Sequence, residues 1–132
     1  MNYILDTHCF LLAIMDSKKL SRKAVEIISN IDNEIFISQI SFWEISLKYS
    51  IGKLELKNVL PDVLPEVAHD SGFDSLPLKS SELASFYKLP LEKHKDPFDR
   101  MIVWQCLLNE YTLISKDIDI KTYKNYGLKI IW

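Results

Sequence analysis

Two aspartates lie just beyond short apolar segments that have the composition of buried strands. Asp6 directly follows residues 3–5, and Asp117 follows residues 111–114 after two intervening positions. Side chains that follow the strands of a parallel sheet gather at one edge of that sheet, where ligands bind. Each aspartate could instead cap a helix, because a carboxylate accepts hydrogen bonds from the free N–H groups of a first turn. The two positions leave both interpretations open.

Glu44 lies in a helical segment that has few polar neighbours. At helical spacing it shares a face with Ile40 and Leu47, and the residues around it are Phe-Trp-Glu-Ile. The alternative is a solvent-facing ion pair with Lys48, one turn further along the helix. We favour a buried or half-buried functional carboxylate, because little polar surface surrounds it.

Asp96 and Asp99 are close in sequence, but helix geometry separates them. Asp96 precedes a proline, and this pair is typical of a helix start with an acidic N-cap. Asp99 then falls at the third helical position, in line with the apolar residues Ile102 and Cys106. The helix dipole also favours an acid at that position on structural grounds alone. We therefore expect Asp96 to cap the helix and Asp99 to point toward the sheet.

Brought together, the four carboxylates Asp6, Glu44, Asp99 and Asp117 would need a cation. Without one they would repel and raise one another's pKa, at a cost of several kcal/mol. Oxygen ligands suit Mg²⁺ or Mn²⁺, and no Cys/His cluster has the spacing of a zinc site. Mg²⁺ held by few carboxylates binds phosphate oxygens. The residue types thus predict a magnesium or manganese site that acts in phosphoryl transfer.

Short apolar strands alternate with longer helical segments along the chain. We expect strands at residues 3–5, 34–38, 73–76, 111–114 and 128–131. Helices are expected at about residues 7–15, 21–31, 39–51, 60–71, 80–87 and 97–109, with a short one near 118–124. Ser21 should begin the second helix, and Gly52 should follow the third with a positive φ. This alternation predicts an α/β fold whose parallel sheet is covered on both faces.

The composition is that of a globular domain. Of 132 residues, 48% are hydrophobic and 26% charged, which excludes collagen-like and disordered classes. No linker or repeat divides the chain, so we expect one domain over residues 1–132. The apolar runs are too short to cross a bilayer and the first residues lack a basic signal region, so we expect a cytoplasmic protein without membrane contact. The net charge of −2 argues weakly against nucleic-acid binding, although a bound cation would change the local sign.

The remaining cysteine, histidine and tryptophan side chains are expected to be structural. The cysteines, Cys9 and Cys106, should be reduced core residues, since each lies alone in an apolar segment. His8 is expected to be hydrogen-bonded at a helix start, and His69 to lie on the surface. The large aromatic residues should pack in the core or in dimer contacts, because burial is their main contribution: Trp43, Trp104 and Trp132.

Four short motifs occur in order along nearly the whole chain. They are Ile4-Leu5-Asp6-Thr7-His8, then Ser41-Phe42-Trp43-Glu44-Ile45 with Gly52-Lys53-Leu54, then His94-Lys95-Asp96-Pro97-Phe98-Asp99-Arg100, and finally Leu113-Ile114-Ser115-Lys116-Asp117. In order and spacing they resemble the PIN domain, and closely the VapC-type toxins of bacterial toxin–antitoxin pairs. One departure is Ser115-Lys116, where many relatives carry Thr or Arg.

The resemblance implies a five-stranded sheet in the order 3-2-1-4-5 and a Mg²⁺- or Mn²⁺-dependent endoribonuclease toxin. It places the acidic positions on Asp6, Glu44, Asp99 and Asp117, with Asp96 as a subfamily feature beside them. It also implies an RNA substrate, a small cognate antitoxin protein and a homodimer. Five basic residues near these positions in sequence are candidate RNA contacts, each with a solvated surface charge as the alternative: Lys48, Lys53, Lys93, His94 and Lys95.

Three other functions fit the residues less well. A receiver domain needs an acidic pair after the first strand, where Asp6 stands alone. A haloacid-dehalogenase-like phosphatase needs a second aspartate two residues later, where the chain has His8. The remaining alternative is a degenerate PIN module that serves as a non-catalytic RNA- or protein-binding scaffold, which the intact set of four carboxylates disfavours.

Overall fold

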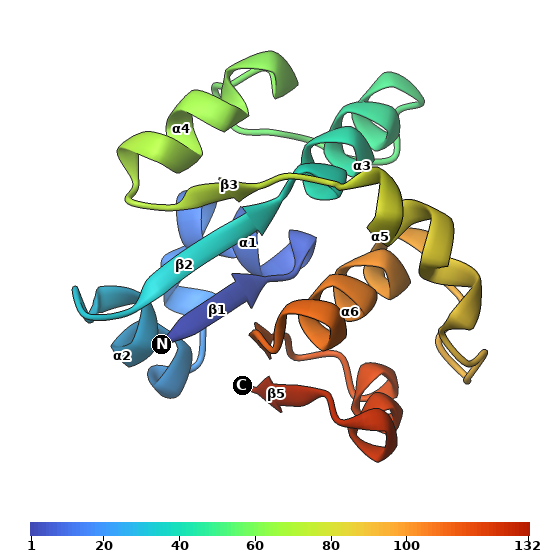
Figure 1. The fold of residues 1–132 in the computed structure, drawn as a ribbon. Coiled ribbons are helices and arrows are strands. Elements are labelled where there is room, and N and C mark those ends of the chain that lie inside the picture. Colours follow the sequence, from blue (N-terminus) through green and yellow to red (C-terminus); the bar gives the residue numbers. More distant parts are fainter.

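A parallel five-stranded sheet forms the centre of the computed structural model, which describes residues 1–132 (Figure 1). The strands lie in the order β3-β2-β1-β4-β5. This confirms the expected α/β class and strand order. The strands are β1 (Asn2–Leu5), β2 (Glu34–Ser38), β3 (Asp74–Leu76), β4 (Thr112–Ile114) and β5 (Lys129–Ile131).

Helices connect the strands close to the expected positions. The α-helices are α1 (Thr7–Met15), α2 (Arg22–Ser29), α3 (Gln39–Ser50), α4 (Leu64–Asp70), α5 (Ser80–Ser85) and α6 (Pro97–Asn109). Short 3₁₀-helices are η1 (Ser17–Lys19), η2 (Pro61–Val63), η3 (Phe86–Lys88) and η4 (Asp119–Tyr126). The expected caps are present, since Ser21 Oγ accepts the Ala24 N–H at 3.0 Å and Gly52 has φ 74°.

Three expected helices are broken or tightened. The helix expected over 80–87 is α5 continued by the 3₁₀-helix η3, and the other two change for local reasons. The helix expected over 60–71 begins with the 3₁₀ turn η2, because Pro65 has no N–H to donate to Pro61 and the α-helical ladder starts only at Leu64. The short helix expected near 118–124 is the 3₁₀-helix η4. It ends at Gly127, whose φ of 99° suits glycine.

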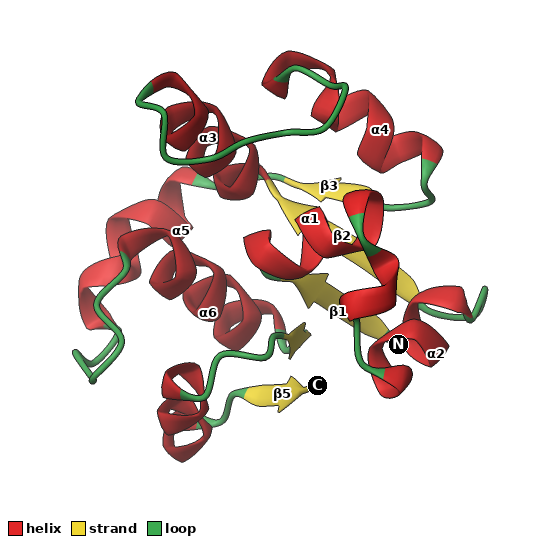
Figure 2. Cartoon of the chain, turned by 180° about the vertical axis from the view of Figure 1, so that it is seen from behind, coloured by secondary structure: helices red, strands yellow, loops and turns green.

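Helices cover both faces of the sheet (Figures 1 and 2), and a separate hydrophobic core lies on each face. On one face, Leu5 and Ile37 pack among residues of α1, α2 and α4. On the other, Ile4 and Leu113 pack among residues of α6 and η4. Consecutive strand residues thus point to opposite faces, as an apolar strand in a covered parallel sheet requires.

The cysteine and tryptophan expectations have different outcomes. Cys9 and Cys106 are free and buried, as expected, and burial raises the pKa of both thiols well above their ordinary value. Trp104 and Trp132 are half-buried. Trp43 does not enter the core, because 59% of its surface is exposed.

No helix combines the length and apolar character needed to cross a membrane.

Candidate acidic metal site

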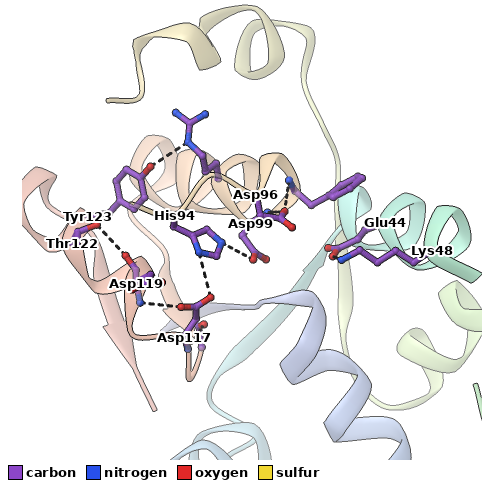
Figure 3. A network of polar contacts seen from close by, with 12 residues as sticks. Glu44, Lys48, His94, Asp96, Asp99, Asp117, Asp119, Thr122 and Tyr123 are labelled. Carbon is purple, nitrogen blue, oxygen red and sulfur yellow. Dashed lines mark hydrogen bonds and ion pairs between the residues drawn. The ribbon is translucent and has the colours of Figure 1, made fainter. Parts of the chain in front are cut away.

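A cleft of about 450 Å³ opens beyond the carboxyl ends of β1 and β4. All four predicted carboxylates line it, together with Asp96, although they come from four separate segments of the chain. Figure 3 shows four of these five acids, Glu44, Asp96, Asp99 and Asp117. The full set of lining residues is Asp6, Thr7, His8, Leu11, Glu44, Lys48, Leu54, Asp96, Asp99, Lys116, Asp117 and Ile118.

Asp6 both caps a helix and lines the cleft. Its Oδ1 accepts the Cys9 N–H at 2.8 Å, and its own N–H donates to the Ile114 carbonyl at 3.2 Å across the sheet. The side chain is 5% exposed. The cap therefore uses one carboxylate oxygen and holds the side chain in place, so that Oδ2 is available to a ligand in the cleft.

Glu44 is buried, as the apolar face of its helix predicts, and is also paired with Lys48. The pair joins Lys48 Nζ to Glu44 Oε2, and Glu44 is only 5% exposed. Burial by itself would lower the pKa of Lys48, but the hydrogen bond and negative charge of Glu44 raise it. Glu44 Oε1 is buried without any hydrogen-bond partner. An unpartnered buried carboxylate oxygen is costly, and a cation in the cleft would compensate for that cost.

Asp96 occupies the N-cap position expected for it. Its Oδ1 accepts the N–H groups of Phe98 at 2.8 Å and Asp99 at 3.1 Å. This pairing fixes the first turn of α6, so the orientation of the next acidic side chain is set by the cap. Asp96 also lines the cleft, which places its negative charge near the other carboxylates.

Asp99 is half-buried among like charges. Burial raises its pKa to about 6, against the hydrogen bond from His94, which lowers it. The charges of Asp6, Asp96 and Glu44 add to the increase. Such a carboxylate resists ionisation only as long as no cation is near, because a divalent ion favours the charged form.

His94 lies between two of the predicted carboxylates. Its Nε2 is 2.8 Å from Asp99 Oδ2, and its Nδ1 is 3.4 Å from Asp117 Oδ2 (Figure 3). The side chain is 13% exposed, so it is occupied inside the acidic cluster rather than displayed to a substrate on its rim. The RNA contact expected of His94 stays a prediction, and in the structure the ring spans Asp99 and Asp117.

Asp117 is held by local turns as well as by His94. Its N–H donates to Ser115 Oγ at 3.2 Å, and its Oδ1 accepts the Asp119 N–H at 2.9 Å. Ligand atoms of His94, Asp117 and Asp119 lie within 4.8 Å of one another. This group shares Asp117 with the cleft and offers nitrogen as well as oxygen ligand atoms, a combination that the spacing of His94 and Asp117 in sequence does not reveal.

The lysines predicted as RNA contacts occupy different positions relative to the cleft. Lys48 lines the cleft but is committed to Glu44, whereas Lys53, Lys93 and Lys95 are exposed and do not line it. Lys116 is exposed and lines the cleft, although it was not among the predicted RNA contacts. Its position next to Asp117 in the fourth motif was the available signal.

The metal-free protein is expected to lose stability as the pH rises because of Asp99. The folded protein holds this proton more tightly than the unfolded chain does, so the free energy of unfolding falls between about pH 4 and pH 6. Asp99→Asn has no such proton to lose. Over that pH range its free energy of unfolding should therefore rise relative to that of wild type by on the order of 1–3 kcal/mol. Chemical denaturation in EDTA at several pH values measures the difference.

The control for this measurement is Asp16→Asn. Asp16 does not line the cleft, and its Oδ2 pairs with Lys19 Nζ at 3.4 Å. Its stability difference from wild type should stay nearly constant over the same pH range. If the Asp99→Asn difference is equally constant, Asp99 does not carry a raised pKa.

Comparisons with known proteins agree with this architecture. A family model described as "PIN domain" matches residues 3–126. No curated protein sequence matches the chain significantly. Among solved structures, VapBC2 from Rickettsia felis bound to a promoter DNA fragment is 19% identical with a TM-score of 0.67, over 99% of this chain and 98% of that one. VapBC-1 from nontypeable Haemophilus influenzae is 17% identical with a TM-score of 0.67, over 99% and 97%. DNA-bound VapBC from Salmonella typhimurium is 15% identical with a TM-score of 0.66, over 99% and 97%.

Proposed function

The chain belongs to the PIN domain family, and from this membership we propose that it is a divalent-metal-dependent endoribonuclease, the toxin of a toxin–antitoxin pair. The observation that carries the proposal is the cleft, in which Asp6, Glu44, Asp99 and Asp117 meet and the buried Glu44 Oε1 has no partner. A site with this excess of negative charge and an unsatisfied buried oxygen suits a hard cation.

The ion would be held by Asp6, Glu44, Asp99 and Asp117. A bound Mg²⁺ or Mn²⁺ ion lowers the pKa of a water molecule and neutralises charge on a phosphoryl group. Hydrolysis of the RNA by water would break the P–O3′ bond and leave 5′-phosphate and 3′-hydroxyl ends. These carboxylates are all oxygen donors, which is the chemistry that Mg²⁺ and Mn²⁺ prefer.

The residues around the carboxylates would keep them oriented. The N-cap hydrogen bond holds Asp6, Lys48 holds one oxygen of Glu44, and His94 bridges Asp99 and Asp117. Lys116 lies exposed at the cleft, where its ammonium group could contact a phosphate of the RNA backbone. Held in this way, the site would need little rearrangement when substrate enters.

The proposal includes a small antitoxin protein as partner and a homodimer as the assembled form. Its support is the resemblance of the four motifs to VapC-type toxins, and the match of the whole chain to solved VapBC structures in overall fold. An antitoxin that inhibits cleavage would act by covering the acidic cleft, with Arg or Lys side chains suited to its charge.

The proposed function is tested by incubating the purified protein with total RNA and mapping new 5′ ends. Cleavage is expected in Mg²⁺ or Mn²⁺, none in EDTA, and full recovery when the metal is returned. Asp6→Asn, which removes one negative charge with almost no change in volume, should lose at least about 100-fold, or about 2.7 kcal/mol of transition-state stabilisation. Asp16→Asn, far from the cleft, should cleave like wild type. Full activity in chelator or in Asp6→Asn would refute the proposal.

A further inference from the structure

An aromatic pair lies directly beside the acidic cleft. The rings of Trp43 and Phe98 meet edge to face, with centroids 5.3 Å apart and planes inclined by 72°. Each residue immediately precedes a cleft carboxylate in sequence, Trp43 before Glu44 on α3 and Phe98 before Asp99 on α6. The pair therefore spans the start of α6 and the middle of α3, the two helices that carry these acids.

One lysine connects the aromatic pair to the cleft. Lys48 Nζ lies 5.8 Å from the centroid of the Phe98 ring, and the same ammonium group pairs with Glu44 in the cleft wall. Phe98 thus contacts both Trp43 and Lys48, and Lys48 lines the cleft. A ligand that extends from the cleft past Lys48 would reach this aromatic pair.

Trp43 is exposed in a way that packing does not explain. An indole is one of the largest apolar groups available for burial, yet 59% of this residue is exposed. Its ring contact with Phe98 is edge to face, and most of the residue remains exposed to solvent. Phe98 is half-buried and packs against the Trp43 ring. The exposed indole is therefore a flat surface that Phe98 holds in place.

On the basis of the proposed ribonuclease function, we propose that Trp43, supported by Phe98, is a stacking site for an unpaired RNA base adjacent to the cleaved phosphate. Every nucleobase has a π-face that stacks on an aromatic side chain, and stacking of this kind tolerates different base sequences. A base within a duplex has both faces covered by its neighbours, so a stacking site selects single-stranded segments or loops.

Two features favour RNA over a protein partner as the occupant. The site is continuous with the acidic cleft through Lys48, so a chain that places a phosphate in the cleft has its neighbouring base within reach of the indole. The exposed indole is also a flat π-face, which suits stacking by a nucleobase. A protein partner would instead use the exposed apolar residues that follow Trp43 along the chain, Leu47 on α3 and Ile51 just after it.

The test measures binding of fluorescein-labelled A₁₂ RNA, single-stranded or annealed to U₁₂, in Mg²⁺ and in the Asp6→Asn background so that no cleavage interferes. Trp43→Leu keeps an apolar contact with Phe98 but removes the π-face, and should weaken single-strand binding by about 5- to 150-fold. Trp43→Phe should restore most of the affinity. The duplex should bind weakly and without dependence on Trp43.

The matched control is Tyr49→Leu, which removes another partly exposed aromatic residue, 39% exposed, from the same helix. It should leave A₁₂ binding unchanged. In the cleaving protein, Trp43→Leu should raise KM for a cleaved single-stranded RNA more than it lowers kcat, because stacking supports binding rather than the reacting atoms. Quenching of tryptophan fluorescence by A₁₂ should disappear in Trp43→Phe, which retains Trp104 and Trp132.

Equal A₁₂ binding by wild type and Trp43→Leu, or no binding by either, overturns the stacking site. A second pattern would also overturn it: Trp43→Leu and Leu47→Ala change the oligomeric state measured by sedimentation but leave RNA binding unchanged. That pattern would assign the surface to contact with a second copy of the chain. Failure of the proposed function is distinct, because it appears as absence of metal-dependent cleavage by wild type, with Trp43-dependent A₁₂ binding retained.

Discussion

Asp99→Asn is expected to abolish RNA cleavage, whereas Asp96→Asn, three residues earlier, should retain most of it. Asp96 uses Oδ1 to accept two N–H groups at the start of α6, and the amide oxygen of Asn can accept the same hydrogen bonds. Asp99 instead presents its carboxylate to the cleft beside Asp6 and Glu44, and Asn there removes a metal-binding charge. We expect a loss of at least about 100-fold for Asp99→Asn, measured as kcat/KM on one RNA.

Stability measurements separate the two aspartates independently of activity. Asp96→Ala has no acceptor for the helix N–H groups and should lower the free energy of unfolding by roughly 0.5–2 kcal/mol. Asp99→Asn should leave the metal-free protein as stable as wild type or more so, because it relieves repulsion among carboxylates. An inactive Asp96→Asn together with an active Asp99→Asn would show that Asp96 belongs to the catalytic set and Asp99 does not.

Glu44→Gln is expected to lower the cleavage rate by at least about 100-fold while the protein stays folded. Glu44 Oε1 is buried without a partner, and the only cation paired with this carboxylate is Lys48 at Oε2. The amide of Gln keeps the size of the side chain but removes the charge that attracts a divalent ion. Isothermal titration with Mn²⁺ should therefore show weaker binding in the variant than in wild type.

The matched control is Glu82→Gln, which neutralises an equally buried carboxylate on α5 outside the cleft. Glu82 is fully partnered by Gln105 Nε2 at 3.2 Å, Asn109 Nδ2 at 3.0 Å and the Lys79 N–H at 3.1 Å. Burial by itself would raise its pKa, but these hydrogen bonds lower it. Glu82→Gln should reduce stability and leave Mn²⁺ affinity unchanged. Equal Mn²⁺ binding by Glu44→Gln and wild type would remove Glu44 from the metal site.

Residues that act through their immediate neighbours in the chain can be identified from the amino-acid sequence alone. The strand endings at Leu5 and Ile114 follow from alternation of apolar segments with helices, and they place Asp6 and Asp117 at one edge of the sheet. Asp96 before a proline is a local helix-start signal, and the three-residue step to Asp99 sets the direction of its side chain. These features depend on backbone geometry and spacing alone, which are properties of a short stretch of chain.

The tertiary structure alone decided how side chains from different segments meet. His94 spans Asp99 and Asp117, Lys116 rather than Lys93 or Lys95 lines the cleft, and Trp43 stays exposed beside Phe98. Each outcome depends on how α3, α6 and the segment after β4 pack against one another, and residue type does not encode those distances. The sequence by itself thus determined which acids lie at the edge of the sheet, and packing decided which groups neutralise, orient and surround them.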